Sequence, residues 1–214
     1  MTAFVPGEYY HIYNRGNSKQ KIFHDKEDYI RFLDLLYISN SFRKFNVFDI
    51  RKVSNIFEMK RDNLHVSIGA YVIMPNHFHI IITQTENGNV SKFMQKLTTA
   101  YSMYYNKKYK RTGGLFEGKF KSIHIPDDRY LKYLFSYIHL NPIKLIQPKW
   151  KEEGIQNKKQ SFQYLNEYEF SSYFDYKNIK RPYSLILSKN AFPEYFPTKK
   201  SFEKEIIEWV NYNN

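Results

Sequence analysis

The segment that most constrains the fold is an apolar run over residues 65–84, interrupted only by Pro75-Asn76. Alternation before the interruption predicts a strand, and the β-branched residues 77–84 predict a second one. Strands joined by so short a link must pair as an antiparallel hairpin, and proline's fixed negative φ makes the turn type I or II. One face of the first strand is predicted to carry Val66, Ile68, Ala70 and Val72.

Two histidines, His77 and His79, lie one residue apart on the second strand. Because side chains alternate along a strand, both imidazoles should leave one face while Phe78, Ile80 and Ile82 leave the other. Two neutral imidazoles on one face supply two ligands of a metal site, although a strand near the wet face of a sheet can also carry two ordinary histidines. The pair by itself leaves both interpretations open.

Further elements follow from periodicity and capping residues. A strand is predicted over residues 8–13, and residues 46–53 are compatible with another. Helices are predicted after Asp25 and after Gly88-Asn89, where apolar residues recur at helical spacing. The list is completed by a short strand over 120–125, a helix over 129–140 closed by Pro142, and a terminal helix over 201–212.

The predicted helix over 129–140 carries a regular polar face. Tyr133, Tyr137 and Asn141 recur every four residues and therefore share that face. A tyrosine phenol can act as a nucleophile, and an amide carbonyl one turn away can bind a metal. A helical tyrosine is more often a packing residue with a satisfied hydroxyl, so this spacing alone does not establish a site.

Charge favours a polyanionic partner. Lys and Arg number 33 against 21 acidic residues among 214, a formal charge of +12. Such an excess favours nucleic acid first and an anionic membrane surface second. Aromatic residues make up 19% of the chain, which suits base stacking and a tyrosine-rich core equally. The basic run 107–111, with its interleaved tyrosine, suits a nucleic-acid backbone or a solvated charged segment.

The absence of cysteine excludes disulfides, thiolate zinc sites and cysteine nucleophiles, and is compatible with a reducing compartment. No apolar run approaches the roughly 20 residues that cross a bilayer, and the N-terminal residues do not form a signal peptide. We therefore expect a soluble cytoplasmic protein without a membrane partner. No glycine-rich phosphate loop is present, so ATP-driven chemistry is not expected.

Three motifs then occur in a defined order: Tyr-Val-Ile-Met-Pro-Asn-His-Phe-His at 71–79, Gly-Gly-Leu-Phe-Glu-Gly-Lys-Phe-Lys at 113–121 and Tyr-Ile-His-Leu-Asn-Pro at 137–142. With the opening at 10–17 and Phe-Ser-Ser-Tyr at 170–173, the chain over residues 8–176 resembles the REP-associated tyrosine transposases. These belong to the single-tyrosine insertion-sequence transposases of the HUH endonuclease superfamily. Three ordered motifs are far more specific than any one of them.

The resemblance implies an α+β, split ferredoxin-like fold, with an antiparallel β-sheet and helices packed on one face. The polar segment from about residue 149 and the predicted terminal helix indicate a mainly helical C-terminal appendage. It implies that Tyr137 attacks a DNA phosphodiester, leaving a 5′-phosphotyrosine and a free 3′-hydroxyl. His77 and His79 would bind a divalent metal, Mg²⁺ or Mn²⁺, and Asn141 is the expected third ligand, where other branches use Gln, Glu or His. Lys121, Lys132 and His139 are candidates for assisting the loss of the phenol proton.

The expected partner is single-stranded or hairpin DNA, and both a monomer and a homodimer remain open. We expect a transposase domain over residues 1–148 and an appendage over 149–214 packed on it. One alternative is a metal-dependent nuclease that uses water as nucleophile. The other is a catalytically silent nucleic-acid-binding protein, and the intact His77, His79 and Tyr137 argue against this second alternative. Residues expected to contact DNA are Arg15, Lys19, Lys107, Lys108, Lys110, Arg111, Lys119 and Lys121.

Overall fold

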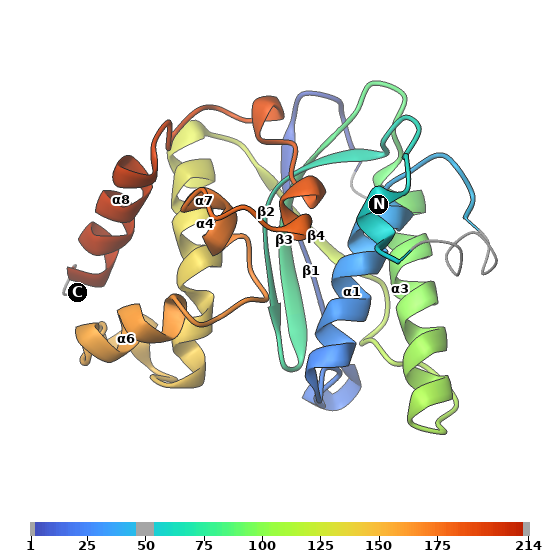
Figure 1. Cartoon of the computed structure of the whole chain (residues 1–214), viewed down its shortest axis with the longest axis horizontal. Coiled ribbons are helices and arrows are strands. Elements are labelled where there is room, and N and C mark those ends of the chain that lie inside the picture. The colour runs from blue at the N-terminus through green and yellow to red at the C-terminus, as the bar shows by residue number, and fades with distance from the viewer. Residues whose placement is uncertain (1–2, 46–53, 212–214) are drawn as a thin grey trace.

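The computed structural model describes residues 3–45 and 54–211, which form a four-stranded antiparallel sheet with helices on both sides (Figure 1). The predicted α+β class and antiparallel sheet are confirmed, whereas the suggested strand at 46–53 lies outside the described residues. The sheet order is β2-β3-β1-β4. The strands are β1 (Tyr9–Arg15), β2 (Val66–Met74), β3 (His77–Gln84) and β4 (Lys121–Ile125).

Two long helices cover one face of the sheet. They are α1 (Lys26–Ser39) and α3 (Val90–Lys108), and each begins with the predicted cap, because the side chains of Asp25 and Asn89 accept backbone N–H bonds. Phe78, Ile80 and Ile82 point into this layer and share its core. Three 3-10 turns border it: η1 (Asn17–Lys19), η2 (Ile56–Glu58) and η4 (Pro182–Ile186).

The opposite face is covered as well. There α4 (Asp128–Leu140) packs on the sheet, and the chain after it adds further elements on the same side (Figure 1). We expect helices on one face only, but α4, which is predicted over 129–140, lies on the face opposite α1 and α3. The other members of this second layer are η3 (Asn141–Leu145), α5 (Trp150–Glu153), α6 (Lys158–Leu165), α7 (Tyr173–Tyr176), η5 (Lys189–Ala191) and α8 (Lys199–Asn211).

A bulge at Gly69 changes which residues of β2 face which layer. The register moves from Ile68 opposite Ile82 to Ala70 opposite Ile81. Val66 and Ile68 therefore join the core beneath α1 and α3, while Ala70 and Val72 join the core beneath α4. The prediction that all four share a face is wrong, because the extra residue at a bulge reverses the alternation. A Cβ at Gly69 would lie 2.9 Å from the rings of Phe135 and Phe192, so these rings pack directly on the glycine backbone.

The β2–β3 hairpin places the first histidine of β3. Met74 pairs with His77 across the two-residue loop Pro75-Asn76, as predicted. Asn76 is not among the described residues with positive φ, which excludes a type II turn. The carbonyl oxygen of Pro75 accepts from the backbone N–H groups of Ile22 and Phe23 at 2.9 and 3.1 Å, so the turn is tied to neighbouring chain.

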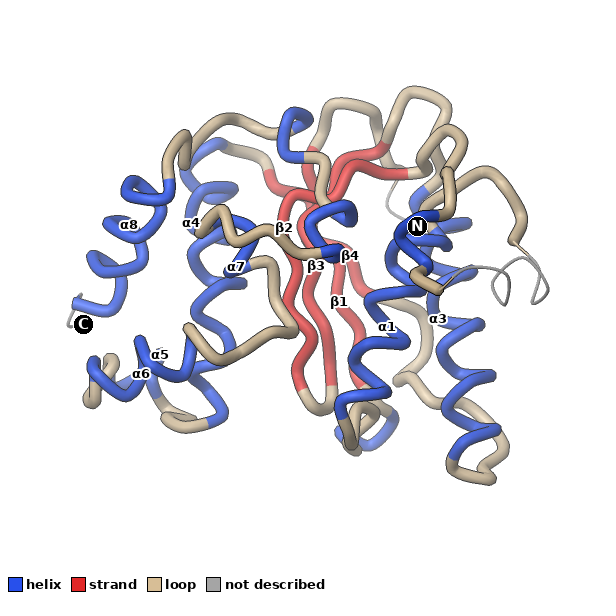
Figure 2. Tube along the Cα trace, viewed as in Figure 1, coloured by secondary structure: helices blue, strands red, loops and turns tan. Residues whose placement is uncertain are grey.

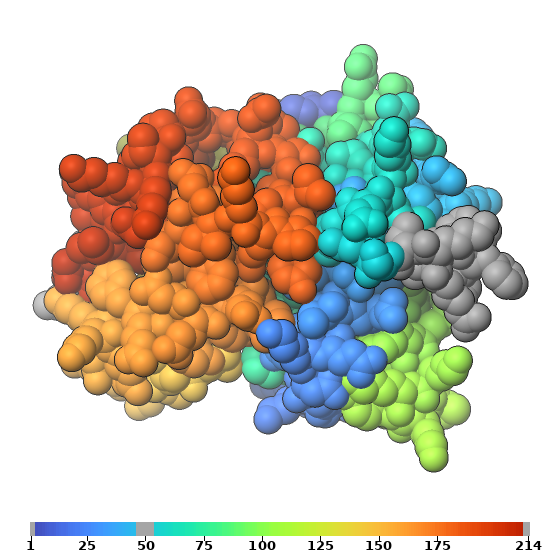
Figure 3. Space-filling view, viewed as in Figure 1, coloured from blue at the N-terminus to red at the C-terminus, as the bar shows by residue number. Residues whose placement is uncertain are grey.

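The segment after residue 149 packs closely on the rest of the chain. Residues 170–172 run beside β2, where the Ile73 N–H donates to the Phe170 carbonyl and the Ser172 N–H donates to that of Tyr71, both at 2.9 Å. Phe202 and Ile206 of α8 share a core with α4. Figure 3 shows the orange and red C-terminal segment in contact with the blue and cyan part of the surface. The boundary at 148/149 stays a prediction. No helix within 3–45 and 54–211 is long and apolar enough to cross a membrane.

Candidate active site between β3 and α4

The two histidines leave the face of β3 that α4 covers, as their spacing predicts. His79 is buried and His77 is half-buried. The register of β1 against β3 places Tyr13 opposite His79, and it brings His11 onto the same face two residues along. His79 is buried because α4 packs over this face, with the Tyr137 ring against the imidazole.

Hydrogen bonds fix both rings. His77 Nδ1 lies 2.6 Å from the side-chain oxygen of Asn76. An amide oxygen only accepts, so Nδ1 carries the proton and Nε2 of the neutral ring keeps a free lone pair. His79 Nδ1 lies 2.9 Å from His11 Nε2, with the two rings stacked at a centroid distance of 5.0 Å. Sequence reasoning missed His11, which is separated from His79 by 68 residues and is brought beside it only by strand pairing.

All three imidazoles are neutral at ordinary pH. Burial, followed by the charge of Lys151, lowers the pKa of His11 to about 4, and burial, followed by the charges of Lys144 and Arg15, lowers the pKa of His77 to about 4. Burial also lowers the pKa of His79 well below the usual histidine value, assisted by the charges of His11 and His77 when protonated. The neutral ring is the form that binds a metal ion, so no proton has to be displaced first.

Helix α4 places Tyr137 against this histidine cluster. The Tyr137 ring meets the His79 ring edge to face, with centroids 5.8 Å apart, and it lies nearly parallel to the Tyr133 ring at 6.1 Å. Burial raises the pKa of the Tyr137 phenol, while a hydrogen bond from Asn141 and the charge of Lys144 lower it. The phenol is therefore protonated at neutral pH.

Asn141 keeps a helical backbone one turn beyond Tyr137. The α-helix does end before Pro142, as predicted, but Asn141 has φ −53° and ψ −37°, and the chain continues as the 3-10 turn η3. The expectation that proline would move the preceding residue out of the helical region is therefore wrong, since the disfavoured conformation is tolerated here. Because Asn141 keeps helical dihedral angles, it stays on the same face of the helix as Tyr137.

The donor atoms present fit a divalent ion. Asn141 is buried, and its side-chain oxygen has no hydrogen-bond partner among the described residues. Within the same part of the chain, no three histidine, aspartate or glutamate side chains are grouped so as to hold a metal. A site here therefore needs the amide oxygen beside the two imidazoles. Such a mixed nitrogen and oxygen set suits Mn²⁺ and also serves Mg²⁺, which prefers oxygen.

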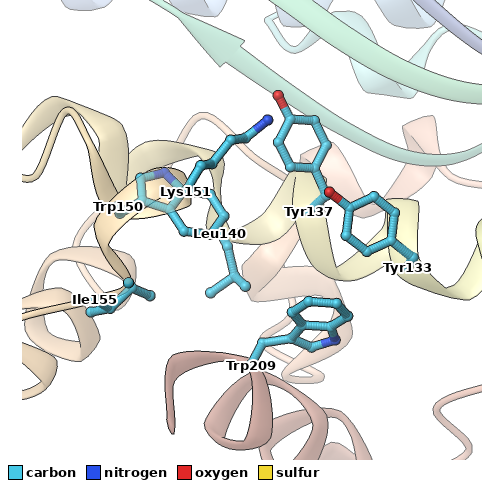
Figure 4. A pocket seen from close by; sticks show the side chains of 8 residues that line it. Tyr133, Tyr137, Leu140, Trp150, Lys151, Ile155 and Trp209 are labelled. Carbon is cyan, nitrogen blue, oxygen red and sulfur yellow. The ribbon is translucent and has the colours of Figure 1, made fainter. Parts of the chain in front are cut away.

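The appendage contributes a cation that sequence reasoning missed. Lys151 of α5 places its Nζ 3.9 Å from the centroid of the Tyr137 ring, and Figure 4 shows its side chain reaching toward that tyrosine. Burial of the ammonium lowers the pKa of Lys151, even though the residue as a whole is exposed. No sequence signal marks it, because it lies in a short polar segment without a recognisable pattern.

Of the three residues predicted to assist the phenol, two are held by other partners. His139 is fully buried and lies 2.8 Å from Ser172 Oγ, two residues after Tyr137 and so about 200° around the helix. Lys132 pairs with Glu205 at 2.8 Å. Lys121 is exposed at the start of the edge strand β4, opposite Tyr13, which is opposite His79, so its side chain leaves the same face of the sheet as His79.

The residues predicted to contact DNA fall into two groups. Lys108 pairs with Asp25, Glu27 and Asp28 at 2.9–3.0 Å, so its charge is neutralised by carboxylates of the protein itself. Arg15 pairs with Glu117, and the Arg111 guanidinium lies 5.6 Å from the Tyr105 ring. The remaining five are exposed: Lys19, Lys107, Lys110, Lys119 and Lys121.

Part of this exposed set gathers at one end of the sheet. The loop before β4 is tied to the chain after β1, because Asn17 N–H donates to the Leu115 carbonyl and Glu117 N–H donates to that of Arg15, both at 2.9 Å. Arg15 itself pairs with His77 in the sheet register. Lys19 and Lys119 therefore lie at the end of the sheet where β3 begins, the lower end in Figure 2.

Comparisons with known proteins agree with this architecture. One solved structure, of a REP-associated tyrosine transposase bound to a REP hairpin, aligns with a TM-score of 0.50 at 12% identity over 85% of this chain and 87% of that chain. It shares the fold. A second, tRNA(His) guanylyltransferase from Saccharomyces cerevisiae, aligns with a TM-score of 0.39 at 11% identity over 92% of this chain and 86% of that chain. A search of curated proteins finds no match.

The model of one protein family, described as "Transposase IS200 like", matches residues 5–141 of the 214. The matched region contains β1 to β4, both histidines of β3, Tyr137 and Asn141. It covers well over half of the sequence, and the fold agrees with that of a solved tyrosine transposase. The chain therefore belongs to the family of IS200-like transposases.

Proposed function

We propose that the protein cleaves and rejoins one strand of a single-stranded or hairpin DNA, with Tyr137 as the nucleophile. The observation that carries this proposal is the convergence of Tyr137, His79 and Asn141 at one end of the sheet. The DNA hairpin bound by the solved relative supports a hairpin substrate. The basic residues beside β3 are suitably placed to contact its backbone.

The reaction requires an oxygen nucleophile and a leaving oxygen. The Tyr137 phenol oxygen would attack the phosphorus atom, the bond to the 3′ oxygen would break, and that oxygen would take up a proton to become a free hydroxyl. The 5′-phosphotyrosine retains the energy needed for rejoining, which a hydrolysed strand would lack. A divalent ion held by His77, His79 and Asn141 would neutralise charge on the non-bridging oxygens.

Tyr137 must lose its proton during the attack, and burial makes this loss harder. Lys151, whose Nζ lies over the ring, would stabilise the negative charge that develops on the phenol. The side chain of Asn141 and the charge of Lys144 act in the same direction. The appendage would thus complete the site that β3 and α4 begin.

The proposal is tested by trapping the intermediate. Wild-type protein incubated with labelled hairpin DNA and Mn²⁺ is expected to carry label through a denaturing gel, attached at the 5′ side of the cut. Cleavage with no adduct at any time point would favour attack by water and hence a nuclease. Binding without cleavage would favour the catalytically silent binding protein.

His11 is expected to tune metal binding without touching the metal. A proton on His79 Nδ1, donated to His11 Nε2, would leave His79 Nε2 free as a ligand. Replacing His11 with Ala should weaken Mn²⁺ binding by about 10- to 100-fold in calorimetry. The exposed His124, which pairs with Glu8, provides the control, because His124→Ala should change nothing. Equal affinity in the two variants would remove His11 from this role.

DNA affinity should fall steeply with salt. For single strands the logarithm of affinity falls by about 0.7 per phosphate neutralised for each tenfold rise in salt. Replacing Lys119 and Lys121 together with Gln should therefore make the slope shallower by about 1.4, measured by fluorescence anisotropy. Lys204→Gln on α8 serves as the remote control. An unchanged slope in the double variant would show that these two lysines contact no phosphate.

A further inference from the structure

A cavity of about 320 Å³ lies beside Tyr137, on the side away from the sheet (Figure 4). Its walls come from α4, from the segment around α5 and from α8, so two of its three sides belong to the appendage. The lining residues are Tyr133, Tyr137, Leu140, Trp150, Lys151, Gly154, Ile155 and Trp209.

The lining combines aromatic rings with the ammonium of Lys151. Trp209 packs against Tyr133 with centroids 5.2 Å apart, and its own N–H donates to Glu205 at 3.0 Å, which holds the ring in place. Lys151 adds an ammonium beside Tyr137. A ligand that presents a flat ring and a negative charge would match the aromatic rings and this ammonium.

The position of the cavity narrows the choice of ligand. Tyr137 both lines the cavity and borders the histidine cluster, so a phosphate placed for attack by its phenol is joined through one sugar to a base at the cavity. The volume lies at the lower end of the range of about 300–1,000 Å³ for ligand pockets, which suits one nucleotide unit. Stacking on an aromatic side chain strengthens binding by roughly tenfold per base.

Resting on the function proposed above, we propose that this cavity receives one unstacked nucleobase from a nucleotide next to the cleaved phosphate. Trp209 offers a ring face to the base, and Lys151 contacts the attached phosphate. The appendage then selects single-stranded DNA at the cleavage point, because a base held in a duplex cannot enter the cavity.

The first test uses binding alone. A hairpin DNA carries the fluorescent base 2-aminopurine at one single-stranded position at a time and is bound to Tyr137→Phe, which keeps the ring but lacks the phenol oxygen. Quenching is expected at one position, and it should be lost in a further Trp209→Ala change but kept with Trp209→Phe. Unfolding measurements on both variants show whether α8 remains packed. The proposal would be overturned if no position showed quenching, or if Trp209→Ala left the quenching unchanged.

The second test uses the reaction. An abasic site at that same position should slow adduct formation by wild-type protein about tenfold or more, the rate equivalent of the stacking energy. Trp209→Ala should react slowly with both DNAs and lose the difference between them. Equal wild-type rates on intact and abasic DNA would overturn the base pocket while leaving the tyrosine reaction standing. Absence of any adduct would count against the proposed function, and the fluorescence result would then decide the pocket.

Discussion

Replacing Tyr137 with Phe is expected to abolish the covalent protein–DNA adduct, lowering strand cleavage by at least about a thousandfold, while metal and DNA binding survive. The change removes one oxygen and little volume. The ring would still meet His79 and Tyr133, so the packing around α4 is retained. Loss of one hydroxyl that interacts with Asn141 should lower the free energy of unfolding by only about 0.5–1.5 kcal/mol. A denaturing gel with labelled DNA and Mn²⁺ measures the adduct.

The neighbouring tyrosine provides the matched control. Tyr133 lies one turn earlier on α4 with its ring nearly parallel to that of Tyr137, and burial raises its pKa too. The Tyr133 ring contacts Trp209, Tyr130 and Tyr137, whereas the ring that meets His79 is that of Tyr137. Tyr133→Phe should therefore keep the adduct. An adduct that persists in Tyr137→Phe and vanishes in Tyr133→Phe would move the nucleophile by one turn of the helix.

Replacing either His77 or His79 with Ala is the second change with a large expected effect. Each change removes one of the two imidazoles proposed to bind the metal, so cleavage should disappear and Mn²⁺ affinity should fall by at least about 100-fold in calorimetry. The two variants should differ in stability. His79 is buried and bonded to His11, so its loss leaves a cavity and an unpaired nitrogen, whereas His77 is half-buried beside a turn.

Thermal unfolding in the absence of metal separates these two effects. His79→Ala is expected to unfold at a lower temperature than His77→Ala, while both lose cleavage equally. His124→Ala, on the exposed edge strand, should match the wild type in both measurements. Unchanged Mn²⁺ affinity in the His77 and His79 variants would remove these histidines from the metal site, whatever happens to cleavage.

Local patterns in the sequence were sufficient to place several parts of the site. The two-residue link at Pro75-Asn76 predicted the hairpin, and alternation along β3 placed His77 and His79 together on the face opposite Phe78. The four-residue spacing of Tyr137 and Asn141 predicted their common face on α4. These features depend on backbone periods of 2 and 3.6 residues, which act over short stretches of chain and are legible without knowledge of the partner elements.

Tertiary structure alone decided which elements those faces meet. The register of β1 against β3 brought His11 to His79, and the packing of the appendage brought Lys151 over Tyr137. The Gly69 bulge reversed the predicted faces of β2, because the rings of Phe135 and Phe192 pack on a backbone without a side chain. Lys108, predicted to contact DNA, instead pairs with carboxylates about 80 residues earlier in the chain. A repeating pattern in the sequence defines which residues share a face of a helix or strand. Which distant segments that face contacts depends on how the whole chain packs, and local sequence patterns do not carry this information.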